Sequence, residues 1–258
     1  MNKLLVFICL LISFKVYGSS DLNGSNPLAE LFHSNNVAGS ILIESEDGQH
    51  TYQYNVNAQA HFVPASTFKI PNTLIILEEG LIKNQNQPIT WDGVERSYAP
   101  WNQDQTLKSA FQISCVWCYQ RYAAMIGNEK FLRYLKAFNY GNLLTGNNIT
   151  RFWLDGDLKI SLQEQIHFLR KVHSGKLPIK PRHISTLKSI MLSESKGGIK
   201  IWSKTGWAGK DGWYVGYLTT EGKTWFFANH IVINSETDLA FRKSITMDAF
   251  NRLNIIKL

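Results

Sequence analysis

The chain has 258 residues, of which 44% are hydrophobic and 18% are charged. These proportions are ordinary for a globular protein, and the length is ample for a hydrophobic core. The formal net charge is +7, but the lysines and arginines are scattered and form neither a basic patch nor a known nucleic-acid-binding module. We therefore expect no nucleic-acid partner. A modest basic excess suits an anionic small substrate, and it also favours solubility.

The first residues have the pattern of a secretory signal peptide. Lys3 is followed by an uncharged apolar run at positions 4–14 and by small residues at positions 18–20. A membrane anchor is the alternative, but the run is shorter than the roughly 20 residues that a membrane-spanning helix needs. We expect residues 1–18 to be cleaved. The mature chain, 19–258, is then periplasmic, has no stable membrane anchor, and carries a net charge of +5 (7 minus the two lysines of the signal).

Strand patterns occur at both ends of the mature chain. An alternation of period two, broken by glycine-bearing turns, predicts strands at 38–45, 51–56, 199–204, 213–220 and 223–233. Helical patterns fill the middle of the chain, at 66–77, 107–126, 129–138, from 161 onward and at 184–192. One more helix is predicted near the C-terminus, at 239–253. Ser161 and Glu164 have the spacing of a capping box at the start of one helix.

This order of elements predicts an α/β (α+β) fold. One antiparallel sheet is built from both chain ends, with flanking helices, and an all-helical lobe packs against it. The chain is then a single catalytic domain whose sheet lobe is about 19–62 and 197–258 and whose helical lobe is about 63–196. A cleft between two lobes is a usual place for a small-molecule site.

The sequence lacks the motifs that several other kinds of catalytic site require. The seven histidines include no pair two or four positions apart, so no compact metal-ligand box exists, and we expect no metal. There is no G-x-S-x-G elbow of serine hydrolases and no glycine-rich phosphate loop.

The remaining candidate is a serine with a lysine. Ser66 and Lys69, in "PASTFK", are three positions apart and share one face of the predicted helix, so the lysine can act as the base for the serine. The S-x-x-K pattern is weak by itself, because it recurs at Ser185–Lys188 and Ser193–Lys196. We expect these two copies to lie on surface helix or turn.

Four further motifs follow Ser66 in a fixed order. They are "SCV" (114–116), "YGN" (140–142), "FWL" (152–154) and "KTG" (204–206). With S-x-x-K, this series resembles the class D (oxacillinase-type) serine β-lactamases, and the likeness extends from about 63 to 242, including "WNQDQTLKSAFQIS" and "GWYVGY". The class A β-lactamases fit less well, because no glutamate is followed by asparagine four residues later and S-D-N is absent.

The resemblance implies the catalytic roles. Ser66 would attack the lactam carbonyl, and Lys69, carboxylated on its amine by carbon dioxide, would be the general base. Ser114 would pass a proton to the departing lactam nitrogen, and Lys204 would supply positive charge beside it. Only a neutral amine adds carbon dioxide, and burial lowers the pKa of a lysine. The residues that the resemblance places around Lys69, as apolar surroundings and as an indole donor for the carbamate, are Phe68, Val116, Trp153 and Leu154.

The same resemblance implies the substrate contacts. The backbone N–H groups of Ser66 and Trp207 would form the oxyanion hole. Thr205 and Arg242 would hold the substrate carboxylate, and Gly206 would let the ligand approach the strand. Tyr140 and Asn142, in "YGN", would shape the cleft. The expected reaction is hydrolysis of penicillins of the oxacillin type and of other β-lactams, which confers resistance, with no cofactor besides the carbon dioxide. The expected state is monomer or homodimer.

Three other classes of protein are compatible with part of this sequence pattern. A penicillin-binding peptidase uses the same S-x-x-K and K-T-G, and a β-lactam sensor domain shares the class D fold. The third is a redox protein built on Cys115 and Cys118. We favour the interpretation that these two cysteines are small apolar side chains on a buried helix, although a disulfide between them also fits an exported chain.

Overall fold

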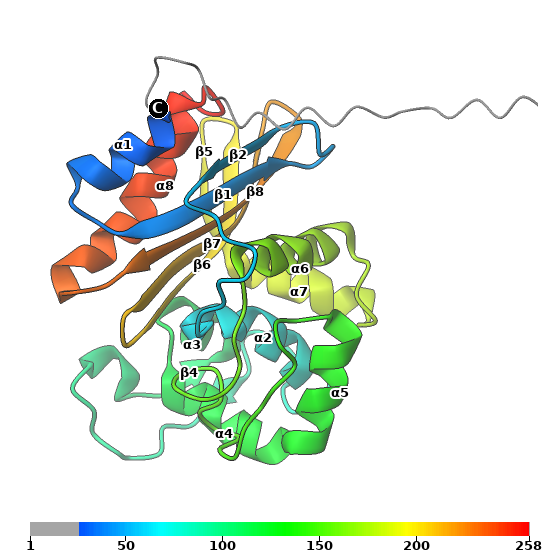
Figure 1. Cartoon of the computed structure of the whole chain (residues 1–258). Helices are drawn as coiled ribbons and strands as arrows, with labels where there is room; N and C mark the ends of the chain where they lie inside the picture. The colour runs from blue at the N-terminus through cyan, green and yellow to red at the C-terminus, as the bar shows by residue number, and fades with distance from the viewer. Residues whose placement is uncertain (1–25, 258) are drawn as a thin grey trace, which may run out of the picture.

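The computed structural model describes residues 26–257 (Figure 1). The expected signal peptide, 1–18, lies outside the described residues. The principal element is a six-stranded sheet with the order β2-β1-β8-β7-β6-β5 and antiparallel neighbours throughout. Its strands are β1 (Gly39–Ser45), β2 (Thr51–Tyr54), β5 (Leu192–Lys196), β6 (Ile199–Ala208), β7 (Asp211–Thr220) and β8 (Lys223–Val232). A small second sheet pairs β3 (Pro88–Ile89) with β4 (Gln105–Thr106).

The two ends of the chain pair with each other inside the large sheet. β1 pairs with β8 from Gly39 opposite Ile231 to Ser45 opposite Trp225. The expected antiparallel sheet built from both chain ends is therefore confirmed. Strand alternation divides the side chains between two cores, since Ile41 belongs to one core and the next residue, Leu42, to the other.

Helices cover both faces of this sheet (Figure 1). On one face, α1 (Pro27–Ser34) and α8 (Phe241–Arg252) lie side by side, and the ring of Phe227 on β8 packs edge-on against Phe250. On the other face, α6 (Leu162–Ser174) packs on β7 and β8. Burial on both faces explains why β7 and β8 are almost continuously apolar.

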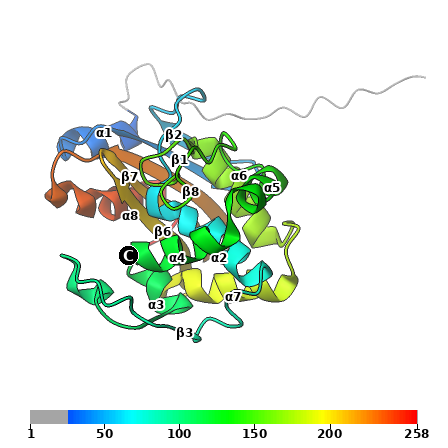
Figure 2. The same ribbon diagram turned by 90° about the horizontal axis from the view of Figure 1, so that it is seen from below.

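The helical lobe is arranged around α2 (Lys69–Glu78), which is buried from Lys69 to Leu77 and contacts both α4 and α7 (Figure 2). The other helices of the lobe are α3 (Leu107–Gln112), α4 (Val116–Ile126), α5 (Asn128–Phe138) and α7 (Pro181–Met191). Three short 3₁₀ helices complete the structure: η1 (Ala65–Phe68), η2 (Ala99–Trp101) and η3 (Glu236–Ala240). Between residues 26 and 257 no helix has the length and apolarity needed to cross a membrane.

Several predicted elements are confirmed, and several short ones were not predicted. The capping box that begins α6 is present, with the Ser161 hydroxyl accepting from the Glu164 backbone N–H and the Glu164 carboxylate accepting from the Ser161 N–H. The helix predicted for 66–77 begins as η1 and continues as α2. The sequence pattern predicted none of α1, β5, η2 and the two-residue strands β3 and β4. β5 places Ser193–Lys196 on a strand instead of the expected helix or turn.

The continuous helix predicted for 107–126 is wrong. It is two helices, α3 and α4, separated at Ile113, Ser114 and Cys115. Ser114 has a φ of 57°, in the left-handed region that a right-handed helix cannot contain. The break turns the chain so that the Ser114 side chain faces the cleft, where it lines the main cavity.

Candidate active site

The nucleophile candidate lies in the tight turn before α2. Ser66 is in η1, and Lys69 is the first residue of α2, so the two side chains share one face one turn apart. The Lys69 Nζ donates a hydrogen bond of 3.1 Å to the Ser66 Oγ. Ala65, just before the serine, has a φ of 50°, a conformation that L-residues adopt rarely and that is frequent at functional sites.

The amine of Lys69 is almost completely shielded from water. The residue is 1% exposed, and burial lowers the pKa of its ammonium from 10.5 to about 7. No carboxylate pairs with it in the described chain, and its Nζ lies 4.9 Å from the centre of the Tyr119 ring. The Tyr119 hydroxyl in turn bonds the Thr73 Oγ1 at 2.7 Å, which fixes the ring. A large share of neutral amine is therefore present near pH 7.

An unused hydrogen-bond donor lies in the same core. Trp153 is fully buried, and its ring stacks on Phe68 with centres 5.6 Å apart. Its indole Nε1 has no hydrogen-bond partner among the described residues. A buried donor without an acceptor is unfavourable, so this N–H is available to an acceptor group added in the core. Val116 and Leu154, expected around Lys69, are half-buried, and Leu154 packs against the same core.

A second serine–lysine pair faces the first from across the cleft. The Lys204 Nζ, on β6, donates to the Ser114 Oγ at 2.6 Å and to the Thr205 backbone oxygen at 2.9 Å. Burial, together with the positive charges of Lys69 and Arg242, lowers the pKa of Lys204 well below its ordinary value. This arrangement places an ammonium that releases its proton more readily than an ordinary lysine next to a hydroxyl, which is the chemistry of a proton relay.

The outer part of β6 forms one wall of the site. β5 pairs with β6 only as far as Trp202, so the edge beyond it has no neighbouring strand and contacts η1 instead. A Cβ added to Gly206 would lie 3.1 Å from the Pro64 oxygen and 3.1 Å from the Thr67 Cγ2. The structure thus shows a packing reason for glycine at this position, because a side chain there would push β6 away from η1. The expected approach of a ligand to Gly206 stays a prediction.

Arg242 reaches this wall from α8. Its Nη1 donates to the Gly206 oxygen at 2.8 Å, and its Nε donates to the Leu239 oxygen at 2.8 Å. Burial lowers the pKa of the guanidinium to about 10. The side chain is therefore held at the end of β6, beside Thr205, as a fixed positive charge.

These residues enclose a cavity of about 690 Å³ between the sheet and the helical lobe. Its lining is Ser66, Ser97, Tyr98, Trp101, Ile113, Ser114, Val116, Thr205, Gly206, Trp207, Glu236, Leu239 and Arg242. Lys69 and Lys204 do not line it but reach it through their bonds to the two serines. Phe68, Trp153 and Leu154 lie behind it in the apolar core.

Some lining residues were not found from the sequence. Tyr98 and Trp101 come from η2 and the residue before it, and Glu236 and Leu239 come from η3. No catalytic motif includes them. The only available signal was the likeness of "WNQDQ", which begins at Trp101, to the family framework.

The "YGN" residues have structural contacts. The ring of Tyr140 is buried and packs edge-on against Phe68, with centres 5.6 Å apart. The Asn142 amide donates to the Asp157 oxygen at 2.8 Å and accepts from the Lys159 N–H at 3.1 Å. Neither residue lines the cavity. Within residues 26–257, no group of three or more His, Cys, Asp or Glu side chains could hold a metal ion.

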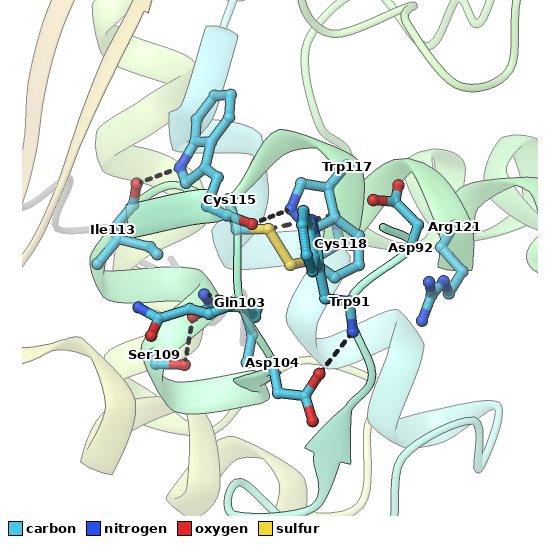
Figure 3. The surroundings of a disulfide bond; sticks show 12 residues. Trp91, Asp92, Gln103, Asp104, Ser109, Ile113, Cys115, Trp117, Cys118 and Arg121 are labelled. Carbon is cyan, nitrogen blue, oxygen red and sulfur yellow. Dashed lines mark hydrogen bonds between the residues drawn. A yellow bond between two sulfur atoms is a disulfide. The ribbon is translucent and has the colours of Figure 1, made fainter. Parts of the chain in front are cut away.

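The expectation for the two cysteines needs a correction. Cys115 and Cys118 are buried, as expected, but they are not separate apolar side chains, because a disulfide joins them (Figure 3). Cys115 is also not inside a helix: it is the N-cap of α4, and Cys118 lies in the first turn. The disulfide therefore lies at the start of α4, directly after the break at Ser114.

A serine with a buried lysine base, facing a second serine–lysine pair across a sheet edge, defines an active-site-serine protein of the penicillin-binding type. Comparison with known families agrees, since the penicillin binding protein transpeptidase domain matches residues 33–252. Among curated proteins, the chain is 38% identical to the β-lactamase OXA-48 of Klebsiella pneumoniae over 87% of both chains. It is 36% identical to the β-lactamase OXA-20 of Pseudomonas aeruginosa over 97% of both.

Solved structures give the same result. The class D β-lactamase YbXI from Nostoc is 39% identical, with a TM-score of 0.86 over 89% of this chain and 99% of that one. The class D β-lactamase FUS-1 from Fusobacterium nucleatum subsp. polymorphum is 33% identical, with a TM-score of 0.87 over 91% of this chain and all of that one. The protein belongs to the class D serine β-lactamases.

Proposed function

We propose that this enzyme hydrolyses the β-lactam amide of penicillins of the oxacillin type through a Ser66 acyl-enzyme, with carboxylated Lys69 as the general base. The observation that carries the proposal is the environment of Lys69. Its buried amine, with a pKa of about 7, lies 3.1 Å from the Ser66 hydroxyl, without a carboxylate partner in the described chain. The unpartnered indole N–H of Trp153 supports an anion in the same pocket.

In the first half of the reaction, the Ser66 Oγ bonds to the lactam carbonyl carbon and the C–N bond of the ring breaks. The backbone N–H groups of Ser66 and Trp207 hold the carbonyl oxygen as it becomes negative, a contribution worth about 2.7–4 kcal/mol for each donor. The departing nitrogen takes a proton from the Ser114 hydroxyl, which recovers one from Lys204 at 2.6 Å.

Substrate is held by its carboxylate. The Thr205 hydroxyl and the Arg242 guanidinium both line the cavity, and Arg242 is fixed by two backbone oxygens. Charge-assisted hydrogen bonds to a carboxylate are among the stronger ones in proteins. A substrate whose carboxylate is held by Thr205 and Arg242 has its lactam carbonyl directed toward Ser66.

In the second half, water cleaves the ester. Carboxylated Lys69 would supply a carboxylate oxygen that accepts the proton of Ser66 during acylation and passes it on to Lys204, which has given one to the lactam nitrogen. During deacylation the same oxygen accepts a proton from the water and returns it to the Ser66 oxygen as the ester bond breaks. Trp153 holds the modified side chain through its Nε1–H, and the apolar core around Phe68 keeps other water away. Carbon dioxide is the only small molecule that this scheme requires besides substrate and water.

We further propose that the protein works in the periplasm as a monomer or homodimer and confers resistance to β-lactams. The disulfide between Cys115 and Cys118 supports export, because disulfides persist in oxidising compartments.

Two measurements on purified mature protein test this function. Sustained turnover of a chromogenic cephalosporin and of oxacillin is expected, whereas one stoichiometric burst that leaves a stable acyl adduct would favour a peptidase or a sensor. Nuclear magnetic resonance after addition of ¹³C-bicarbonate should show one carbamate signal that is absent from Lys69→Met.

The role of Trp153 has its own test. Trp153→Phe keeps the stacking on Phe68 but removes the N–H, so the ¹³C carbamate signal should weaken and deacylation should slow by at least tenfold. Acylation should slow less. Equal effects on both steps, with an unchanged carbamate signal, would contradict the proposed donor.

A further inference from the structure

The disulfide lies directly against one of the two reactive serines. Cys115 follows Ser114 in the chain, and its partner Cys118 is in the first turn of α4. Both cysteines are at most 1% exposed, and neither lines the cavity. The sulfur atoms therefore do not touch substrate, and any effect on the reaction passes through the backbone of their neighbours.

The position of the Ser114 hydroxyl depends on an unusual backbone conformation. Its φ of 57° is uncommon for a residue with a side chain, and the Oγ must meet the Lys204 Nζ at 2.6 Å. Its own N–H makes a bond of 3.2 Å to the Phe111 oxygen, at the long end of the normal range. A serine in an unfavourable conformation with one long backbone bond depends on its neighbours for its position.

Those neighbours are fixed on both sides (Figure 3). On the N-terminal side, the Trp101 Nε1 donates to the Ile113 oxygen at 3.1 Å, and the Trp117 Nε1 donates to the Trp101 oxygen at 2.9 Å. On the C-terminal side, the disulfide ties Cys115 to Cys118, and the Cys115 sulfur accepts from the Cys118 N–H at 3.3 Å. Ser114 thus sits between two anchored residues.

We propose that the Cys115–Cys118 disulfide is a positioning element for Ser114, so that the oxidised enzyme acylates faster than the reduced one. This inference rests on the proposed role of Ser114 as the proton relay to the lactam nitrogen. Without the cross-link, Cys115 can move relative to α4, and Ser114 can relax toward a negative φ, which takes its Oγ away from Lys204. The step that needs this hydroxyl is acylation, so the loss falls there more than on deacylation.

Reduction is a defined chemical change. A dithiol such as dithiothreitol transfers two electrons and two protons to the disulfide, forming the Cys115 and Cys118 thiols and its own cyclic disulfide. Because both sulfur atoms are buried, the native enzyme is expected to resist brief treatment and to lose activity only as the thiols form.

The main test compares three variants: Cys115→Ala, Cys118→Ala and the double variant. Each removes the same bond, so each should lower the acylation rate constant by about the same factor, between 5-fold and 20-fold, and the double variant should be no worse than either single one. The deacylation rate constant should stay within twofold. Leu135→Ala, in the buried face of α5, is the stability control: it lowers the melting temperature but leaves the acylation rate within twofold.

A merely structural disulfide gives a different result. In that case all four variants lower the melting temperature while acylation stays within twofold in protein that remains folded, and the proposal is overturned. Independent, additive effects of the two single variants would also overturn it, since they would reflect side-chain packing and not the bond.

A second measurement needs no variant. Unaltered enzyme is reduced by dithiothreitol for increasing times, excess reagent is removed, and free thiols and acylation rate are measured on the same samples. The rate should fall in proportion to the thiols that form and return on reoxidation. An enzyme that carries two free thiols and acylates at the original rate refutes the inference. An oxidised enzyme without β-lactam turnover refutes instead the proposed function on which it rests.

Discussion

The buried amine of Lys69 should destabilise the folded protein, and removing it should be measurable as a gain in stability. Lys69→Met replaces the ammonium by an apolar side chain of similar length in a pocket where no carboxylate of residues 26–257 pairs with it. The enzyme should become inactive, because Lys69 is the proposed base, and yet become harder to unfold. A catalytic group that is unfavourable for folding is a known trade-off between stability and activity.

The magnitude follows from the pKa of Lys69. Burial lowers it from 10.5 to about 7 in the folded protein, and each unit is worth about 1.36 kcal/mol, so the destabilisation is about 5 kcal/mol below pH 7. Above pH 7 the folded state has released the proton and the unfolded state has not. Stability of the original protein therefore rises with pH, and the destabilisation falls to about 1 kcal/mol at pH 10.

Two smaller effects change the expected difference in the free energy of unfolding between Lys69→Met and the original protein. The variant loses the hydrogen bond to Ser66, worth about 1 kcal/mol. It also removes one of the charges that lower the pKa of Lys204, an effect of the opposite sign. We expect Lys69→Met to be more stable by about 3 to 4 kcal/mol at pH 6 and by about zero at pH 10.

The assay is urea unfolding of both proteins from pH 6 to pH 10 in buffer freed of carbon dioxide, so that no carbamate contributes. Lys136→Met, on the exposed side of α5, is the control and should change stability by less than about 1 kcal/mol at every pH. A Lys69→Met protein that is no more stable at pH 6, or whose gain does not shrink as the pH rises, would refute the reasoning about the buried amine.

Two further predictions concern the β6 wall. Gly206→Ala brings a Cβ within 3.1 Å of the Pro64 oxygen and of the Thr67 Cγ2, so β6 must move away from η1 and kcat/KM should fall by roughly tenfold or more; activity within twofold of the original would show that the wall is not tightly packed. Arg242→Gln should raise KM for penicillins by about 10-fold to 100-fold with little change in kcat, because a charge-assisted hydrogen bond to the substrate carboxylate is lost. Lys243→Gln, its exposed neighbour paired with Glu194, should leave KM unchanged, and an equal effect of both variants would contradict the assignment of Arg242.

Structural features that depend on residues close together in the sequence could be predicted. The period-two pattern of the end strands follows from alternation of side chains in an extended chain, and it correctly indicated the antiparallel sheet. The capping box at Ser161 and Glu164 is a contact between residues three apart, and it was predicted in detail. The spacing of Ser66 and Lys69 likewise placed both side chains on one face.

Features that depend on backbone conformation were not predictable from side-chain pattern. The apolar periodicity of 107–126 continues through Ser114, so the pattern indicated one helix, whereas the φ of 57° at that residue divides it. From the sequence, a disulfide between Cys115 and Cys118 was one of three open interpretations, beside a redox pair and two apolar side chains on a helix, and the structure shows the disulfide. β5 was missed because its side chains are exposed and polar, which leaves no alternation of burial to read.

By itself, then, the sequence determined most of the helices and strands and the order in which the reactive residues occur, because helix, strand and cap preferences act over a few residues. Only the tertiary structure decided how those residues combine. The pairing of β6 with β7 and its contact with η1 bring Lys204 to Ser114, 90 positions away, and α8 brings Arg242 to Gly206, 36 positions away. Burial of Lys69 also belongs to this level, because the lowered pKa of its amine arises from burial in the folded core.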